Sequence, residues 1–287
     1  MNEFGGDWTK IKIEILVKYA QAYLTIMNVF ANRYKWRLLY FDGFAGSGEI
    51  IKITNDELLG NQNTEVTIGA ARRIIELNDP RSFDEYYFVE KDLNNYLRLV
   101  ENTKKAFPKK KISTIQEDCN KKLIDLSNFL RTPKNKNYRT LVYIDPCGMQ
   151  LEWRSIEALK ELPIDMWVLV PTGLGVNRLL KNNGQISDAW LERLEKFLGM
   201  DKSEIEKYFY KKSASLFPDI TIIKKEHDAI AKSSNLYRSR LKEIFNFVSN
   251  PYELKNSSKS IMYHLYLTSN NSNAIKIAND IVREYNI

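Results

Sequence analysis

Cysteine and histidine are scarce in this chain. Its 287 residues include two cysteines, Cys119 and Cys147, and two histidines, His227 and His264, which lie far apart. Two cysteines are too few for a disulfide framework or a cysteine-based zinc site, and the histidines show no metal-ligand spacing. We therefore expect a protein without a metal centre.

Long apolar runs are also absent. No stretch approaches the length of a membrane span, and residues 1–7 have neither the basic nor the apolar region of a signal peptide. We expect no contact with a membrane and a cytoplasmic location. Because 44% of the residues are hydrophobic and 12% are aromatic, the chain has ample material for a packed core.

Acidic residues are the minority among the charged ones. The chain has 43 lysines and arginines against 36 aspartates and glutamates, a formal net charge of +7. Such an excess favours a polyanionic partner, because binding releases counterions. The sharpest basic run is Lys104–Lys111, although a lysine run between a helix and a strand is usually a solvated loop.

The stretch Leu38–Gly48 reads as a buried strand that runs into a glycine-rich turn, with Asp42 at the strand end. Glycines permit positive φ and let a ligand approach the backbone closely. The spacing is not the G-x-G-x-x-G of dinucleotide-binding proteins. A tight turn also needs glycines for steric reasons, so the turn alone leaves a cofactor site and a structural turn both open. The residues of the turn expected to contact a cofactor are Asp42, Gly43, Phe44, Ala45, Gly46 and Gly48.

Strand-like and helix-like patterns alternate along most of the chain. Apolar and β-branched runs end at Asp42, Glu90, Asp118, Asp145 and Pro171, and helical patterns separate them. This alternation predicts an α/β fold with a mostly parallel sheet and helices on both faces. A strand over 261–268 and a shorter one within 247–254 are expected to form an antiparallel end.

We divide the chain into four parts. Residues 1–36 form an amphipathic helix that covers the sheet edge or the pocket mouth, and 37–176 form the Rossmann-like cofactor-binding core. Residues 177–246 read as a helical insertion, and 247–287 complete the core with strands and a helix. Within the core, the polar segment Ile50–Thr67 has no clear period and is expected to be a binding loop or lid.

Four carboxylates follow predicted strands: Asp42, Glu90, Asp118 and Asp145. Ligands of open α/β sheets bind beyond the carboxyl ends of the strands, so these acids are expected to share one site. S-adenosylmethionine suits them: Glu90 would bind the ribose diol, Asp118 the adenine amino group and Asp42 the methionine ammonium. A nicotinamide cofactor fits less well, because no glycine loop offers its pyrophosphate a helix N-terminus.

The strand end Asp145-Pro146-Cys147-Gly148 is the predicted catalytic position. Methylation of an exocyclic or side-chain nitrogen needs no strong base, because an acceptor that draws on the N–H leaves the lone pair available. A carboxylate held by a rigid proline turn can be that acceptor, and we assign the role to Asp145. Cys147 has no histidine nearby in sequence to activate it, so we interpret it as a small turn residue beside the substrate.

Several short motifs in one order resemble the three-Cys-motif partner protein family. They are Trp8-Thr9, Phe41–Gly48, Tyr87–Asp92, Asp118-Cys119-Asn120, Ile144–Gly148 and Tyr263–Asn271, and together they span nearly the whole chain. The resemblance implies a class I methyltransferase-like fold from bacteria or archaea, and a separate partner protein that carries the three-cysteine motif. It assigns Asp42, Gly46 and Gly48 to the cofactor loop, Glu90 to the ribose, Asp118, Cys119 and Asn120 to the adenine side, and Asp145 with Pro146 to catalysis.

The sequence departs from one pattern that matters for the substrate. Amino-methyltransferases of nucleic-acid bases usually carry a second proline and an aromatic residue at the catalytic strand end, whereas Cys147 and Gly148 stand here. Trp153 is the expected replacement for the stacking aromatic. Trp8 and Lys10 are further candidates for the pocket mouth, although a core position is the more common one for a tryptophan on a packed helix.

Two functions remain open from the sequence. The first is an S-adenosylmethionine-dependent methyltransferase, with a nitrogen of a nucleic-acid base as the preferred acceptor and a protein or small molecule not distinguished from it. The second is a non-catalytic partner that retains the pocket and recognises another protein through residues 177–246. The sequence does not give the oligomeric state.

Overall fold

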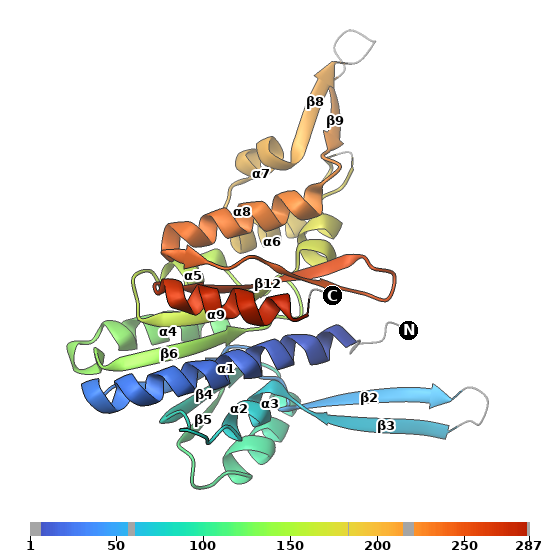
Figure 1. Ribbon diagram of the computed structural model, residues 1–287. Helices are drawn as coiled ribbons and strands as arrows, with labels where there is room; N and C mark the ends of the chain where they lie inside the picture. The colour runs from blue at the N-terminus through green and yellow to red at the C-terminus, as the bar shows by residue number, and fades with distance from the viewer. Residues whose placement is uncertain (1–6, 57–60, 183, 215–220, 286–287) are drawn as a thin grey trace.

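The computed structural model describes residues 7–56, 61–182, 184–214 and 221–285. A central sheet in the order β10-β12-β7-β6-β1-β4-β5, with β11 also paired to β12, organises the body of the protein (Figure 1). The strands of this sheet are β1 (Arg37–Asp42), β4 (Glu85–Glu90), β5 (Ile112–Gln116), β6 (Tyr138–Ile144), β7 (Ile164–Val170), β10 (Phe247–Val248), β11 (Tyr252–Lys255) and β12 (Ile261–Ser269).

The sheet is mostly parallel with an antiparallel end. Strands β5, β4, β1, β6 and β7 pair in parallel, whereas β12 runs antiparallel to β7, and β10 and β11 run antiparallel to β12. The order reverses between β1 and β6, which is the switch point where ligands bind in sheets of this kind. The predicted α/β, Rossmann-like fold with a mostly parallel sheet and an antiparallel end is therefore confirmed.

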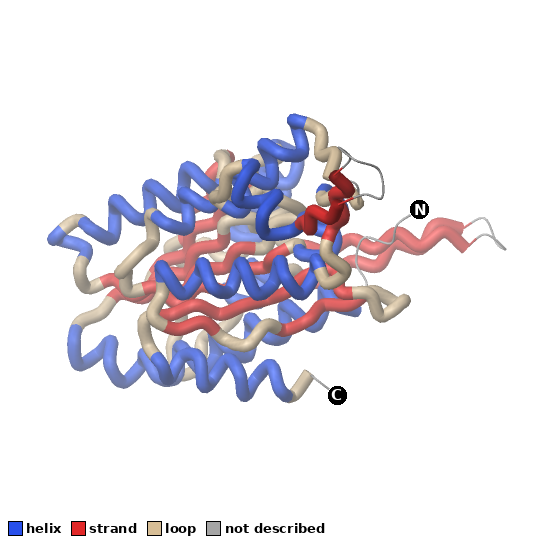
Figure 2. Tube along the Cα trace, turned by 90° about the horizontal axis from the view of Figure 1, so that it is seen from above, coloured by secondary structure: helices blue, strands red, loops and turns tan. Residues whose placement is uncertain are grey.

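Helices cover both faces of the sheet (Figure 2). One face carries α1 (Asp7–Tyr34), α2 (Ala70–Ile75), α3 (Leu93–Val100) with its π-helical continuation η1 (Glu101–Lys105), and α9 (Ser272–Arg283). The other face carries α4 (Cys119–Arg131), α5 (Trp153–Glu157), α6 (Asp188–Leu198), α7 (Lys202–Phe209) and α8 (Ala229–Ile244). Two short turns complete the body, η2 (Pro133–Asn135) and η3 (Thr172–Asn177).

The alternation of side chains along the strands divides the core into two halves. Tyr40, Tyr143 and Trp167 face α1 and α9, whereas Phe41 and Val142 face α4 and α5. Both faces are apolar because both are covered, and this explains why the strands read as nearly continuous hydrophobic runs in the sequence. Apolar residues of α6, α7 and α8 belong to the second half of this core, so these three helices fold onto the sheet.

Two hairpins depart from the sequence predictions. The segment expected to be a loop or lid is largely an antiparallel pair, β2 (Glu49–Asp56) with β3 (Asn61–Ile68), which projects from the body in Figure 1. The insertion expected to be helical also contains β8 (Tyr210–Ala214) and β9 (Thr221–Lys225). The β2–β3 hairpin is rich in isoleucine and threonine, which favour strands, whereas in the other hairpin these residues occur only in β9. Neither hairpin joins the central sheet, so the pattern of buried strands does not predict them.

Within the described residues, no helix is long and apolar enough to cross a membrane. In the same part of the chain, no three side chains of His, Cys, Asp or Glu gather as a metal site. His264 is buried, with its Nδ1 2.7 Å from Oγ1 of Thr172, and burial lowers its pKa to about 4. This histidine is a neutral core residue.

Candidate functional site

A hollow of about 340 Å³ lies at the carboxyl ends of β1 and β6, beneath the first turns of α1. Its floor is the glycine turn after β1, one wall is Asp145 to Cys147 after β6, and another wall is formed by Trp8, Lys12 and Tyr263. The volume falls within the range of small-molecule sites. The position matches the switch point of the sheet.

The turn after β1 is fixed to its two neighbouring strands. The amide of Gly43 donates to the carbonyl of Tyr143 at 3.0 Å, and the amide of Ala45 donates to the carbonyl of Val89 at 3.0 Å. Gly46 and Gly48 have φ values of +61° and +78°, which favour glycine. A Cβ on Gly46 would find no atom within 4 Å, so this backbone is open to a ligand.

Asp42 lies at the buried floor of the hollow. Its Oδ1 accepts from the amide of Phe44 at 3.2 Å, and its Oδ2 accepts from the hydroxyl of Tyr40 at 3.4 Å. The pKa of Asp42 is raised to about 8, mainly by burial and also by the charges of Asp145 and Glu90, against the lowering effect of the hydrogen bonds from the Phe44 amide and the Tyr40 hydroxyl. A cation in the hollow would favour the ionised form of this carboxyl.

Glu90, at the end of β4, reaches the same glycine turn. Its Oε2 accepts from the amide of Gly46 at 2.9 Å, and its Oε1 accepts from the amide of Asp92 at 2.7 Å. Each oxygen of an ionised carboxylate has about two lone-pair sites, so each retains capacity for a hydroxyl donor. The Glu90 carboxylate is therefore held in place while still able to bind a diol.

Asp145 is paired with Lys12 of α1. The Nζ atom of Lys12 lies 2.6 Å from Oδ2 and 2.8 Å from Oδ1 of Asp145, and the hydroxyl of Tyr143 donates to Oδ2 at 3.0 Å. Both charged side chains are nearly buried. The geometry fixes the Asp145 carboxylate at the end of β6 and adds the Lys12 ammonium, which the sequence analysis did not assign.

Aromatic rings line the mouth of the hollow. The ring centroids of Trp8 and Tyr263 are 5.3 Å apart, and the Lys12 ammonium lies 5.1 Å from the Trp8 ring centroid. The hydroxyl of Tyr263 donates to the carbonyl of Cys147 at 3.3 Å. Trp8 packs on the core and also lines the hollow, so its position agrees with both the core position and the pocket-mouth position considered for it.

The predicted adenine-side residues lie outside the hollow. Asp118 accepts from the amide of Asn120 at 2.9 Å as the N-cap of α4 and pairs with Lys91 at 3.0 Å. The Asn120 side chain donates to the carbonyl of Gln150 and accepts from the amide of Glu152, so it holds the loop before α5. Contact of Asp118 and Asn120 with an adenine ring stays a prediction.

Cys119 requires a correction. Cys119 is buried, and a Cβ on Gly43 would clash with its Sγ atom and lie 2.8 Å from Ile144. The thiol therefore fills the space that the missing Cβ of Gly43 leaves under the turn. Neither residue lines the hollow, so the Cys119 side chain is corrected to a packing residue beneath the turn, and contact of Gly43 with a cofactor stays a prediction.

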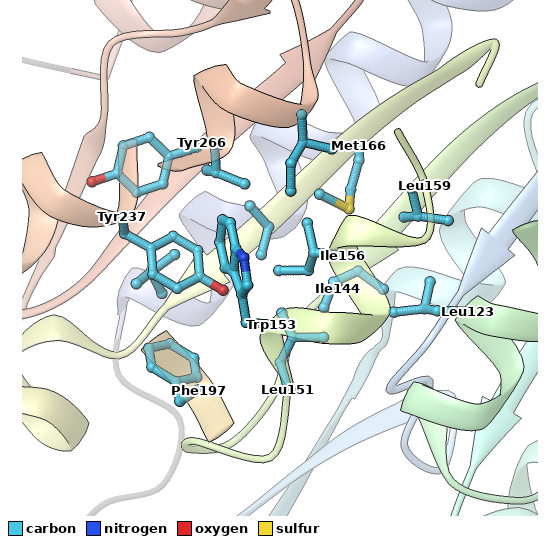
Figure 3. Close-up of a cluster of buried hydrophobic side chains, with 14 of the residues drawn as sticks. Leu123, Ile144, Leu151, Trp153, Ile156, Leu159, Met166, Phe197, Tyr237 and Tyr266 are labelled. Carbon is cyan, nitrogen blue, oxygen red and sulfur yellow. The ribbon is translucent and has the colours of Figure 1, made fainter. Parts of the chain in front are cut away.

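Trp153 also requires a correction. It is 2% exposed and lies among Tyr237, Phe197 and Ile156, as Figure 3 shows. Its ring meets the ring of Tyr237 edge-on at a centroid distance of 5.4 Å, and its Nε1 donates to Glu157 at 2.7 Å. An indole enclosed in this way cannot stack on a substrate base.

Some of the remaining predicted residues line the hollow and others do not. Pro146 and Cys147 line the hollow, whereas Gly148 lies beyond it, where its amide donates to Oε1 of Gln150. Lys10 is exposed and does not line the hollow. Lys12, Tyr143 and Tyr263 were missed. Lys12 could have been found from its position four residues after Trp8, which puts both on one helix face.

A scan of protein-family models and a search of curated proteins found no match to this chain. Among solved structures, it is similar to protein LPL1258 from Legionella pneumophila, with a TM-score of 0.41, 16% identity, and coverage of 94% of this chain and 91% of that one. It is also similar to the candidate methyltransferase yhhF from Escherichia coli, with a TM-score of 0.32, 11% identity, and coverage of 85% and 84%.

A further similar structure is the complex of Trm1 from Pyrococcus horikoshii with S-adenosyl-L-methionine. The TM-score is 0.37 and the identity 11%, with coverage of 94% of this chain and 65% of Trm1. Because the TM-scores are below 0.5, the function of this chain has to be argued from its own residues.

Proposed function

We propose that this protein is an S-adenosylmethionine-dependent methyltransferase whose preferred acceptor is a nitrogen of a nucleic-acid base. The observation that carries the proposal is the hollow at the switch point of the sheet. It joins an open glycine backbone, a buried carboxyl and an ion-paired carboxylate, with the Glu90 carboxylate bound to the same glycine turn.

The charges of the site match those of the cofactor. S-adenosylmethionine has a sulfonium, an ammonium and one carboxylate, and the charged residues among the described lining of the hollow are the acids Asp42, Glu49 and Asp145 and the basic residue Lys12. Asp42 would bind the ammonium, and Lys12 would bind the methionine carboxylate. Glu90 would accept hydrogen bonds from the ribose hydroxyls.

The chemistry assigned to the protein is positioning and charge placement. When bound, S-adenosylmethionine supplies a methyl group on a sulfonium, which is electrophilic without activation by the protein. Asp145 would accept a hydrogen bond from the N–H of the acceptor amine, so that the nitrogen lone pair stays available. Lys12 and Tyr143 hold the Asp145 carboxylate in one orientation for that contact.

Calorimetric titration with S-adenosylmethionine and S-adenosylhomocysteine tests the cofactor part of the proposal. We expect both to bind, and the Glu90→Gln variant to bind about 10-fold or more weakly, since an uncharged amide oxygen is a poorer acceptor. The matched control is Glu243→Gln, an exposed residue of α8. If the folded protein takes up neither ligand, the proposal fails.

Transfer of a labelled methyl group to RNA, DNA and protein tests the acceptor. We expect label in nucleic acid, and a loss of about 10²- to 10⁴-fold in kcat for Asp145→Asn, with cofactor binding retained. Label in protein alone would refute the nucleic-acid part of the proposal and leave the methyltransferase part standing.

The second candidate is a non-catalytic partner in the three-Cys-motif partner family, which works with a separate three-cysteine-motif protein. The lobe of α6, α7, β8, β9 and α8 favours it, because the β8–β9 hairpin projects from the top of the body in a different direction from β2 and β3 (Figure 1). If Asp145→Ala left the cellular phenotype intact while surface changes in Trp190–Leu198 abolished it, this alternative would replace the first proposal.

A further inference from the structure

Three aromatic rings gather at the end of α1 that lies away from the hollow. The ring centroids of Phe30, Tyr34 and Trp36 are 5.2 to 6.4 Å apart, with interplanar angles of 11° to 32°. Phe30 is 40% exposed and Tyr34 is 50% exposed. Neighbouring exposed rings of this size mark a contact site more often than scattered apolar residues do.

The same end of the molecule concentrates positive charge. Residues 30–37 contain three basic residues and residues 131–139 contain four, and neither segment contains an acid. Outside them, the remaining 36 basic residues equal the 36 acidic residues of the whole chain. These two segments therefore account for the entire net charge of +7.

The two segments lie side by side. The amide of Arg37 donates to the carbonyl of Asn137 at 3.0 Å, and the side chain of Asn137 donates to the carbonyl of Lys35 at 3.2 Å. Strands β1 and β6 continue this pairing from Arg37 opposite Tyr138. We call this surface, made of residues 30–37 and 131–139, the basic aromatic edge.

Cations and rings interleave on the basic aromatic edge. The guanidinium of Arg139 lies 4.0 Å from the ring centroid of Trp36, and that of Arg33 lies 5.4 Å from the ring centroid of Tyr34. A cavity of about 330 Å³ opens beside Phe30, Trp36 and Arg139. Arg37 forms an ion pair with Glu85, while the described contacts of Arg33 and Lys35 include no acid.

We propose that the basic aromatic edge binds single-stranded nucleic acid. Proteins that bind single strands combine a positive surface for the phosphates with aromatic side chains on which the bases stack, and both occur here within two adjacent segments. A purely apolar protein partner would leave the excess of cations unmatched, whereas a polyanion releases counterions by neutralising them. Charge complementarity therefore selects the nucleic acid.

The inference deepens the proposed function, because it concerns a second contact for the preferred acceptor. Helix α1 carries Trp8 at the hollow and Tyr34 at the basic aromatic edge, and it runs along the body between the two (Figure 1). A helix of this length spans about 40 Å. A nucleic-acid strand bound at the basic aromatic edge would therefore be held at a point far from the atom that receives the methyl group.

Fluorescence anisotropy with labelled oligonucleotides of about 12 nucleotides tests the inference, with RNA and DNA of one sequence as separate arms. Tyr34→Ala and Phe30→Ala are each expected to weaken binding by about 5- to 20-fold through lost stacking. The control is Phe247→Ala, since Phe247 is also 40% exposed but lies in β10 at the antiparallel end of the sheet.

The charge contribution has its own readout. For the double variant Arg33→Gln/Lys35→Gln, the slope of log affinity against log salt is expected to fall by about 1.4, or 0.7 for each lost phosphate contact. The control Lys207→Gln/Lys242→Gln, in α7 and α8, removes two exposed lysines elsewhere and is expected to leave the slope unchanged.

The inference would be overturned if the protein bound no oligonucleotide, or if the variants of the basic aromatic edge and the control variants weakened oligonucleotide binding equally. Capture of a protein at this surface without oligonucleotide binding would overturn it as well. Cofactor titration of the same variants separates the two proposals: a variant that binds cofactor normally but not the oligonucleotide supports the inference. A wild-type protein that binds oligonucleotide but no cofactor refutes only the proposed function.

Discussion

The Nζ atom of Lys12 lies 2.6 Å from Oδ2 of Asp145 and so joins the start of α1 to the end of β6. The two residues are 133 positions apart in the sequence. Because both side chains are nearly buried, the loss of one partner leaves the other charge poorly solvated.

Replacement of Lys12 by Met is therefore expected to lower the free energy of unfolding by about 1–3 kcal/mol. The double variant Lys12→Met/Asp145→Asn is expected to recover part of that loss, because no unpaired charge remains. Denaturant unfolding measures both. The control Lys10→Met changes an exposed lysine of the same helix, and a similar loss there would contradict the prediction.

Asp42 makes stability depend on pH. Its pKa is raised from 3.8 to about 8, so between these values the folded protein keeps a proton that the unfolded chain has lost. The contribution of Asp42 to stability therefore falls as pH rises, by about 1.4 kcal/mol per pH unit. Asp42→Asn is expected to remove this slope between about pH 5 and 7 in denaturant unfolding. An unchanged slope would show that Asp42 titrates normally.

Gly43→Ala is expected to destabilise the protein, because the new Cβ meets Sγ of Cys119 beneath the turn. Overpacking of this kind costs about 1–3 kcal/mol. Cys119→Ala in the same chain removes the sulfur and is expected to restore part of the stability, which thermal unfolding of the four variants would measure as a coupling energy. Additive effects would argue against this contact.

Trp153→Ala is expected to cost about 3–5 kcal/mol of stability through the cavity it leaves in the core. The folded fraction is expected to bind S-adenosylmethionine with unchanged affinity, since the indole does not line the hollow. Calorimetry under conditions where the variant is folded measures this. A selective loss of substrate binding without loss of stability would restore Trp153 as a substrate contact.

The sequence predicted the parts of the site that local pattern determines. Asp42, Glu90 and Asp145 follow long buried strands, and parallel strands bring their carboxyl ends to one edge whatever the details of packing. Lys12 and Tyr263 were not predicted, because their place depends on how α1 and β12 are rotated against the sheet. Such rotations follow from tertiary packing.

Two errors share another cause. Trp153 stands near Gly148 in the sequence, but the helix α5 that it begins turns the indole into the core opposite Tyr237. The β2–β3 hairpin differs from the predicted loop. Neither of its strands joins the central sheet, so its sequence lacks the run of apolar residues that predicts β1. The distance between two residues in the sequence and the spacing of apolar residues along a segment both indicate burial only indirectly.

The hydrogen bond from Tyr263 to the carbonyl of Cys147 has a consequence for the order of assembly. Strand β12 is the last strand of the described sheet to be synthesised, and it inserts between β7 and β10. A nascent chain that ends before Tyr263 already has the glycine turn, Asp42 and Asp145, but the wall formed with Trp8 and Lys12 still lacks its Tyr263 ring. The hollow therefore gains the Tyr263 side of its wall only after β12 has been synthesised and has joined the sheet.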